Sequence, residues 1–310
     1  MAKAPRVKNQ HYVPQAILRR FHNTKGKIFA YDKWERKIYT TSTRNVASEN
    51  GFYDVTIGNE FVSRDPEMGQ VEQANLCTIE SILANRSLAG LEELHRWKLS
   101  YFFAVQFMRT KAARAMVQQM EEGLRASLPN KNLNESQMPE GFFMDEEQLK
   151  AQSVSNLNIA RLLAPHLLNK HWLLDSPMDG AVFLISDNPL VKRNANESLP
   201  FWSNAGIACP GMQVYMPLSP SLAVCLICDT LVAPFREAKD QYPEVFNPLL
   251  DAIDSGEPME VPKETVIHQN SLQIAQSTRF VFSSTDDFSL ADEMLTTNPE
   301  LARPRYLEVR

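Results

Sequence analysis

The sequence lacks the features that would assign it to a membrane or a secreted protein. No run of about 18 apolar residues occurs, and the first residues do not combine a basic start with an apolar stretch. We therefore expect no membrane span and no secretion signal, and the expected location is the cytoplasm.

Cysteine is scarce, with four residues in a chain of 310. Cys225 and Cys228 have the spacing of half a zinc site, but they lie in an apolar, strand-like run and no second pair has a suitable spacing. We therefore expect buried thiols at these positions.

Several motifs of known enzyme classes are also missing. No G-x-G-x-x-G or G-x-x-x-x-G-K-[ST] segment follows a predicted strand, which disfavours the common nucleotide-binding folds. The chain has no G-x-S-x-G and no H-E-x-x-H segment, and no E-x-K follows Asp187. Serine hydrolase chemistry therefore has no support, and the usual nuclease signatures are absent.

A long apolar stretch followed by polar residues organises the chain. Residues 181–186 read as a buried strand, which Asp187, Asn188 and Pro189 end abruptly. Asp and Asn tolerate tight turns, and proline has no N–H to continue a strand ladder. Two polar side chains are thereby predicted at the rim of a buried sheet.

The predicted fold is α+β, with a mainly antiparallel sheet packed against a long buried central helix and further helices. The central helix is expected over residues 91–128, with Gln106 and Arg109 one turn apart within its apolar middle. A second long helix, bent at Pro165, is expected over residues 145–174. The predicted organisation is a basic arm (1–10), a single domain (11–283) with an internal loop near 129–146, and a polar C-terminal tail (284–310).

Charge is divided unevenly along the chain. Residues 1–50 hold eleven Lys or Arg and three Asp or Glu, a net charge of +8, whereas the whole chain has a net charge of −5. Such a basic front can meet phosphate groups or simply be solvated. His11 precedes a short predicted helix that begins near Pro14 and bears Arg19 and Arg20.

Five short segments together resemble one known family. They are Gln10-His11-Tyr12-Val13-Pro14-Gln15 with Leu18-Arg19-Arg20-Phe21, Gln106-x-x-Arg109-Thr110, Ile185-Ser186-Asp187-Asn188-Pro189, Pro217-Leu218-Ser219-Pro220, and an Asn near the start of the last helix. This combination is similar to the family of bacterial domains of unknown function numbered 4238, over about residues 9 to 283. The resemblance implies one shared fold and a common site, and it implies no particular activity.

The functional hypothesis is a nuclease-like or other phosphoester hydrolase that acts on a phosphate-bearing ligand, which could include nucleic acid. His11 and Asp187 are the candidate catalytic pair, and a divalent metal ion held by Asp187 is the candidate cofactor. The candidate ligand contacts are Gln106, Arg109, Asn188, Arg19 and Arg20.

Three alternatives stay open at this point. The chain could be a non-catalytic binding module for an anionic ligand, with Arg109 and Asn188 as contacts. It could dock a partner through the loop that contains Trp202. In the third alternative these residues are structural, so that Arg109 and Asp187 pair with each other and His11 caps backbone.

Overall fold

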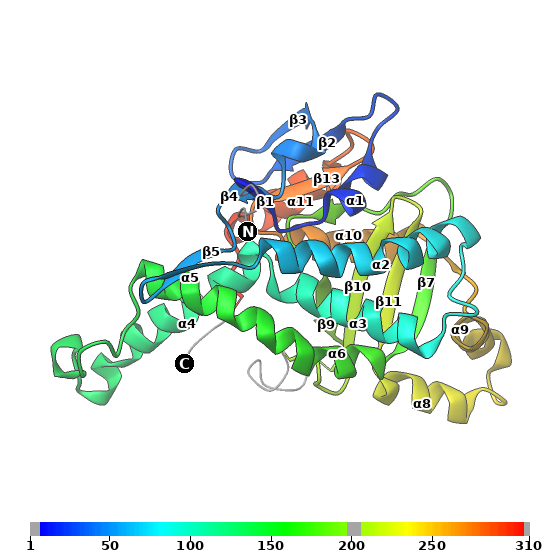
Figure 1. Cartoon of the computed structure of the whole chain (residues 1–310). Coiled ribbons are helices and arrows are strands. Elements are labelled where there is room, and N and C mark those ends of the chain that lie inside the picture. Colours follow the sequence, from blue (N-terminus) through cyan, green and yellow to red (C-terminus); the bar gives the residue numbers. More distant parts are fainter. Residues whose placement is uncertain (1–6, 197–205, 307–310) are drawn as a thin grey trace.

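The computed structural model describes residues 7–196 and 206–306, and these ranges fold into layers of helices and sheets (Figure 1). The described strands pair antiparallel, apart from the parallel contact between β12 and β7. The expected α+β class with a mainly antiparallel sheet is confirmed. Trp202 and residues 1–6 of the expected basic arm lie outside the described residues.

The larger sheet of the described chain has the strand order β12-β7-β11-β10-β9. These strands are β7 (His171–Pro177), β9 (Val191–Asn194), β10 (Met212–Ser219), β11 (Leu222–Ile227) and β12 (Met259–Val261). Its successive residues face opposite layers: Leu174 and Val224 join the main core, whereas Leu173 and Cys225 join a second core. Both faces are covered by helices, which explains the nearly continuous apolar runs in the sequence.

A smaller sheet joins the two ends of the chain, with the strand order β3-β2-β13-β8. Its strands are β2 (Ile28–Asp32), β3 (Lys37–Thr41), β8 (Ile185–Ser186) and β13 (Phe280–Ser283). Two further strand pairs flank it, β1 (Asn9–His11) with β4 (Ser48–Asn50) and β5 (Asp54–Ile57) with β6 (Glu60–Ser63).

The helices surround both sheets, and α2, α3 and α6 lie on one face of the larger sheet (Figure 1). Their bounds are α1 (Gln15–Leu18), α2 (Asp65–Asn85), α3 (Glu93–Met108), α4 (Lys111–Ser127), α5 (Glu146–Ser155), α6 (Ala160–Leu168), α8 (Asp229–Ala238), α9 (Pro243–Ser255), α10 (Lys263–Gln276) and α11 (Ser289–Thr297). Single turns of 3-10 helix occur at Arg19–Phe21, Thr43–Asn45, Pro129–Lys131, Glu135–Gln137, Asn156–Ile159 and Pro299–Ala302.

The expected helix over residues 91–128 is two helices, so that prediction is wrong in its continuity. α3 ends at Met108, and Thr110 has extended backbone angles (φ −94°, ψ 166°) and caps α4 by accepting a hydrogen bond from the Ala113 N–H. The buried central helix is therefore α3, in which Phe102 and Phe103 are buried and Phe107 is half-buried.

The region 145–186 differs from its prediction in two places. The expected helix to residue 174 ends at Leu168, and His171–Pro177 forms β7, which lies between β12 and β11 in the larger sheet. The expected strand 181–186 is paired only at Ile185–Ser186. Before it, the Asn270 side chain takes the place of a neighbouring strand, because its Oδ1 accepts from the Leu184 N–H (2.8 Å) and its Nδ2 donates to the Val182 carbonyl (2.9 Å).

The C-terminal segment expected as a loose polar tail from residue 284 instead packs on the smaller sheet. Phe288, Ala291 and Leu295 are buried in a cluster with Tyr31 and Val281. The prediction of a loose tail is wrong because acidic residues stand between these three apolar positions in the sequence. They make the segment look polar, although the apolar positions form one buried face of a helix.

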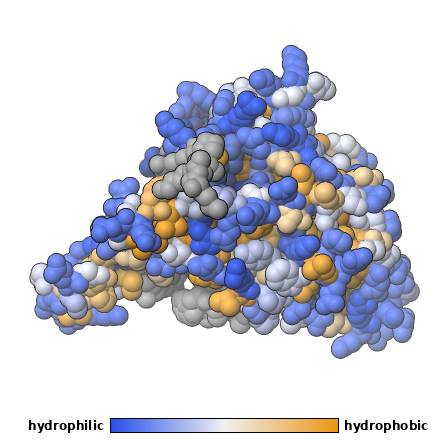
Figure 2. Space-filling model, in the orientation of Figure 1, coloured by the Kyte–Doolittle hydropathy of each residue, from blue (hydrophilic) through white to orange (hydrophobic). Residues whose placement is uncertain are grey.

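No helix in the described residues combines the length and the apolar content needed to cross a membrane. Figure 2 shows apolar side chains among polar ones on one face of the molecule, including the projecting arm that α4, α5 and the segment between them form. The exposed apolar residues of that arm are Met120, Leu124, Leu133 and Phe142.

Candidate functional site

The segment Gln10–Pro14 is held by hydrogen bonds from several distant elements. Gln10 is buried, its Nε2 donates to Asp54 Oδ1 (2.8 Å), and its Oε1 accepts from the Tyr53 N–H (2.6 Å). The Tyr53 hydroxyl donates to the His11 carbonyl (3.1 Å). The first strand is thereby fixed beside β5.

Gln106 and Arg109 meet at the Tyr12 carbonyl. Gln106 Nε2 donates to it at 3.0 Å, and Arg109 Nε donates to it at 3.2 Å. Arg109 Nη2 also donates to the His11 carbonyl (3.1 Å) and to Glu72 Oε1 (2.6 Å). Arg109 is 1% exposed. Glu72 therefore neutralises the charge of Arg109, and the guanidinium also donates hydrogen bonds to two backbone carbonyls of the same chain.

Two polar atoms of this cluster keep unused hydrogen-bonding capacity within the described chain. Gln106 Oε1 and Arg109 Nη1 are buried without a partner, as is Arg114 Nε. Arg109 and Arg114 line a cavity of ≈ 10 Å³. A void of that size holds about one water molecule and is too small for a phosphate group.

His11 lies at the edge of the same cluster. Its Nε2 is 3.2 Å from the Thr43 carbonyl and 3.1 Å from Gln15 Nε2, so it donates to the first or accepts from the second. Burial lowers the pKa of His11 below its usual value. Burial therefore favours the neutral form of the ring.

Asp187 is fully buried, and its carboxylate accepts hydrogen bonds from the backbone at the start of β13. Its carboxylate accepts from the N–H groups of Thr278 (2.7 Å), Arg279 (2.8 Å) and Phe280 (2.9 Å). Burial raises the pKa of Asp187, and these hydrogen bonds and the nearby Lys33 charge oppose that rise. The alternative in which Arg109 and Asp187 pair with each other is wrong, because Arg109 pairs with Glu72.

Asn188 connects the junction between α3 and α4 to the end of α10. Its Oδ1 accepts from the Thr110 hydroxyl (3.2 Å), and its Nδ2 donates to the Gln276 carbonyl (3.0 Å). Arg19 and Arg20 lie in the 3-10 turn that follows α1. Arg19 donates to Gln15 Oε1 (2.7 Å), and Arg20 donates to the Ala16 carbonyl (2.6 Å).

The structure thus brings together some of the predicted site residues. His11, Gln106 and Arg109 gather around the Tyr12 carbonyl, and the charge of Asp187 acts on the Tyr12 phenol. The side chains of Gln106, Arg109 and Asp187 are buried in contacts with the chain.

Asn188 also lines a pocket of ≈ 310 Å³, which we term the Lys192 pocket. It lies between α4, β9, α10 and the C-terminal segment, and its lining contains no Asp or Glu among the described residues. The lining residues are Phe107, Ala112, Ala113, Met116, Asn188, Lys192, Arg193, Asn194, Met212, Gln276, Arg305 and Tyr306.

The basic residues of the Lys192 pocket were not among the predicted site residues, because no strand was predicted at residues 191–194. β9 instead places Lys192 and Arg193 three and four residues after Pro189. The Lys192 ammonium lies 5.2 Å from the centroid of the Phe107 ring, and burial lowers the pKa of Lys192. The signal available in the sequence was the Lys-Arg pair that closely follows the Asp187-Asn188-Pro189 turn.

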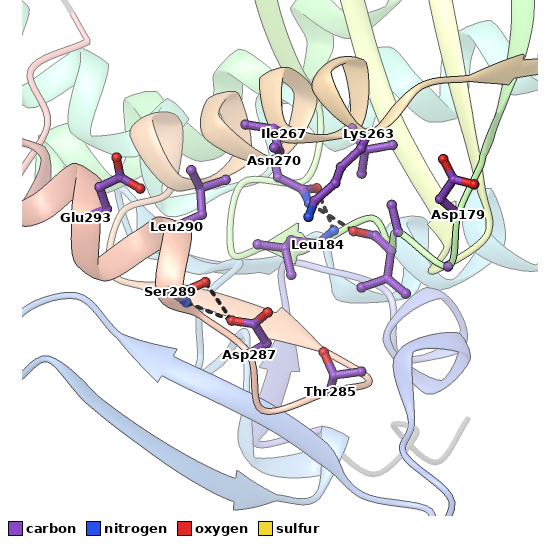
Figure 3. A pocket seen from close by; sticks show the side chains of 14 residues that line it. Asp179, Leu184, Lys263, Ile267, Asn270, Thr285, Asp287, Ser289, Leu290 and Glu293 are labelled. Carbon is purple, nitrogen blue, oxygen red and sulfur yellow. Dashed lines mark hydrogen bonds between the residues drawn. The ribbon is translucent and has the colours of Figure 1, made fainter.

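A second pocket, of ≈ 480 Å³, is lined by residues 179–182 and 184, by α10 and by the segment around the start of α11 (Figure 3). Lys263 and Asn270 of α10 lie on one side of it, with Asp287 and Ser289 opposite (Figure 3). The Asn270 amide is used by the backbone of residues 182–184, and Asp287 accepts hydrogen bonds from Ser289. Its mixture of charges indicates no particular class of ligand.

Groups of three or more His, Cys, Asp or Glu side chains that could hold a metal ion do not occur in the described part of the chain. Of the four thiols, Cys225 alone is buried, so the expectation of buried thiols is wrong for Cys228, which is half-buried at the start of α8.

Comparison with known proteins supports the resemblance found in the sequence. No curated protein and no solved structure matches this chain. The model of one family, described as protein of unknown function (DUF4238), matches residues 9–287. All five motif segments lie within that range. The chain therefore belongs to the DUF4238 family.

Proposed function

We propose that this chain binds a phosphate-bearing ligand in the Lys192 pocket. The observation that carries the proposal is the composition of the pocket: Lys192, Arg193 and Arg305 line it together, and no carboxylate does so among the described residues. Lys and Arg side chains in a concave, partly apolar site favour a phosphate over a neutral ligand.

The wall that bears these cations is fixed by hydrogen bonds. Gln276 Oε1 accepts from the Lys192 N–H (3.1 Å), and Gln276 Nε2 donates to the Lys192 carbonyl (2.7 Å). Asn188 holds the Gln276 carbonyl from the other side. A site whose backbone is already ordered loses less conformational entropy when a ligand binds.

The pocket also has an apolar lining, which indicates a ligand with an apolar part. Phe107, Ala112, Ala113 and Met116 contribute to it from α3 and α4, and Met212 contributes from β10. A nucleotide or another phosphate ester with a planar group matches both the cations and this lining, because the phosphate can meet the cations while the ring packs on Phe107.

Hydrolysis of a phosphoester stays a prediction with weaker support than binding. The described lining of the Lys192 pocket contains no His, Asp or Glu to act as a general acid or base. His11 belongs to the cluster around Tyr12, and Asp187 is fully engaged by backbone N–H groups. The non-catalytic binding of an anionic ligand is therefore the function that the geometry supports best.

Calorimetric titration with adenine and guanine nucleotides, pyrophosphate and a 5′-phosphorylated oligonucleotide tests the proposal. We expect at least one to bind, and Lys192→Met or Arg193→Gln to weaken that binding by about tenfold or more, a loss of roughly 1.4 kcal/mol. Lys239→Met, which removes an exposed charge after α8, is the control and should bind as the wild type does.

Binding should also weaken as the salt concentration rises, because charge contributes to it. If all probes fail to bind the folded wild type, or if Lys192→Met and Lys239→Met bind equally well, the proposal is wrong. Release of inorganic phosphate by the wild type, lost in His11→Ala, would restore the hydrolase hypothesis.

A further inference from the structure

One end of the larger sheet brings Lys170 and Cys228 together. His171 pairs with Ile227, and Ile227 pairs with Gln213, so Lys170, Cys228 and Met212 continue the same row one residue further on. Lys170 Nζ donates to the Met212 carbonyl at 3.1 Å. The Lys170 side chain must therefore extend from the start of β7 to the start of β10, across the end of β11. Cys228 lies at that end of β11, between β7 and β10.

Cys228 lies in a setting that stabilises a thiolate. It is the residue before the first turn of α8, and its Sγ accepts from the Thr230 hydroxyl at 3.3 Å. Burial raises the pKa of this thiol, but hydrogen bonds from Thr230 and Gly211 and the Lys170 charge lower it below its usual value. A half-buried cysteine beside a lysine and a helix start is the usual environment of a reactive thiol.

Cys209 lies in the turn that contacts this site. The Met212 N–H donates to the Cys209 carbonyl (3.3 Å), and the Gly211 N–H in the same turn donates to the Thr230 hydroxyl (2.9 Å). The turn 209–212 is therefore tied to both Lys170 and Thr230. The Lys170 charge interacts with the thiols of Cys228, Cys209 and Cys225, and of these Cys209 and Cys228 are half-buried.

The two remaining cysteines differ from this pair. Cys225 lies inside β11 and is buried, and burial raises its pKa well above the usual value. Cys77 is exposed and lies on α2, which is a different element from those that carry Cys209 and Cys228. These differences leave Cys209 and Cys228 as the two thiols that share one site and are at least partly accessible from solution.

We propose that Cys228 and Cys209 form a reversible disulfide when the protein meets a peroxide. The Cys228 thiolate attacks one peroxide oxygen, the O–O bond breaks, and the leaving hydroxide takes a proton to become water, which leaves Cys228 as a sulfenic acid. The Cys209 thiol then attacks the sulfenic sulfur, the S–O bond breaks, and a second water leaves. The protein loses two hydrogen atoms, and a small dithiol reverses the change.

Treatment of the purified full chain with hydrogen peroxide tests this proposal by intact mass and peptide mapping. We expect a loss of two hydrogen atoms, a peptide in which Cys209 and Cys228 are joined, and full reversal by dithiothreitol. Cys209→Ser should leave a sulfenic acid on Cys228 that dimedone traps. Cys228→Ser should abolish both products, and Cys77→Ser should react as the wild type does.

The rate of alkylation tests the activation of Cys228 separately. With iodoacetamide at pH 7, Cys228 should react about tenfold faster than Cys77, because the thiolate is the reactive form. Lys170→Met should slow Cys228, whereas Lys170→Arg should preserve its rate. A peroxide product that joins other cysteines, or equal alkylation of Cys228 and Cys77 in the folded protein, would overturn the proposal.

Discussion

Arg109 and Asp175 are both buried ions, but their surroundings differ in how well they stabilise charge. Arg109 faces Glu72 and two carbonyls. Asp175 lies in the middle of β7 and accepts one hydrogen bond, from the Gln269 amide. A charge removed from water is costly unless nearby groups replace the water. Arg109 meets that condition and Asp175 does not, so burial raises the pKa of Asp175 to about 6.

Asp175→Asn should stabilise the protein above pH 7 by roughly 2–3 kcal/mol, the energy of a shift of about two pKa units. The unfolded carboxyl titrates near pH 4 and the folded one near pH 6, so the folded state binds more protons between these values. The difference in unfolding free energy between the wild type and the variant is therefore most favourable to the wild type below pH 4. It turns against the wild type as the pH rises through 6. Urea unfolding at pH 4.5 and pH 8 measures the difference, and an equal effect of the substitution at both pH values would contradict it.

At the scale of elements, the buried carboxylate of Asp187 joins the exit of β8 to the entrance of β13. Three consecutive N–H groups, from Thr278 to Phe280, have this side chain as their acceptor. Beside it, the buried Lys33 ammonium donates to the carbonyls of Ile274 and Ser277 at the end of α10. The connection between α10 and β13 is therefore held by one charge of each sign.

Asp187→Ala should destabilise the protein by about 3–5 kcal/mol, as much as Phe183→Ala. Each buried N–H left without an acceptor costs roughly 1–3 kcal/mol, and truncating a buried phenylalanine costs about 3–5 kcal/mol. Guanidinium unfolding measures both values. Asp286→Ala, at an exposed position of the loop that follows β13, is the matched control and should change stability little. A small effect of Asp187→Ala would show that the carboxylate does not organise β13.

The sequence was sufficient to predict those helices and strands in which the apolar pattern agrees with the residues that mark the ends of the element. Asp65-Pro66, an acidic residue followed by proline, begins α2, and β10 and β11 follow their apolar runs closely. It was insufficient where a distant group decides the structure. The break at Arg109-Thr110 depends on carbonyls of residues 11 and 12, and the extended segment 182–184 depends on the Asn270 side chain. Neither partner can be identified from local periodicity.

The candidate site was predictable in part for the same reason. The sequence identified polar residues set beside apolar runs, and the structure brings Gln106 and Arg109 onto the segment that follows Gln10. What it could not show is that Arg109 and Asp187 are enclosed by backbone groups. It also missed Arg305, which lines the Lys192 pocket together with β9 from the opposite end of the chain.

At the scale of the whole molecule, both ends of the chain complete one sheet. β2, from the first 32 residues, pairs with β13, and α11 buries Phe288 and Leu295 against that sheet. Lys33 also donates to the Leu301 carbonyl at 2.7 Å. The N-terminal hairpin, the Asp187-Asn188-Pro189 turn and the C-terminal segment therefore pack together, and we expect them to unfold as one cooperative unit rather than as a domain with a separable tail.

Two truncations distinguish these possibilities. Removing residues 288–310 exposes the faces that Phe288 and Leu295 cover, and losing two such side chains costs more than about 5 kcal/mol, comparable with the whole stability of many proteins. We expect that variant to lack a cooperative thermal transition. Removing residues 304–310 should leave the transition in place, because Pro304, Arg305 and Tyr306 do not belong to that cluster. It should, however, increase hydrogen exchange in α4 near Gln119, which loses its bond to the Tyr306 N–H (2.7 Å). A cooperative thermal transition in the variant that lacks residues 288–310 would show that these residues are a dispensable tail.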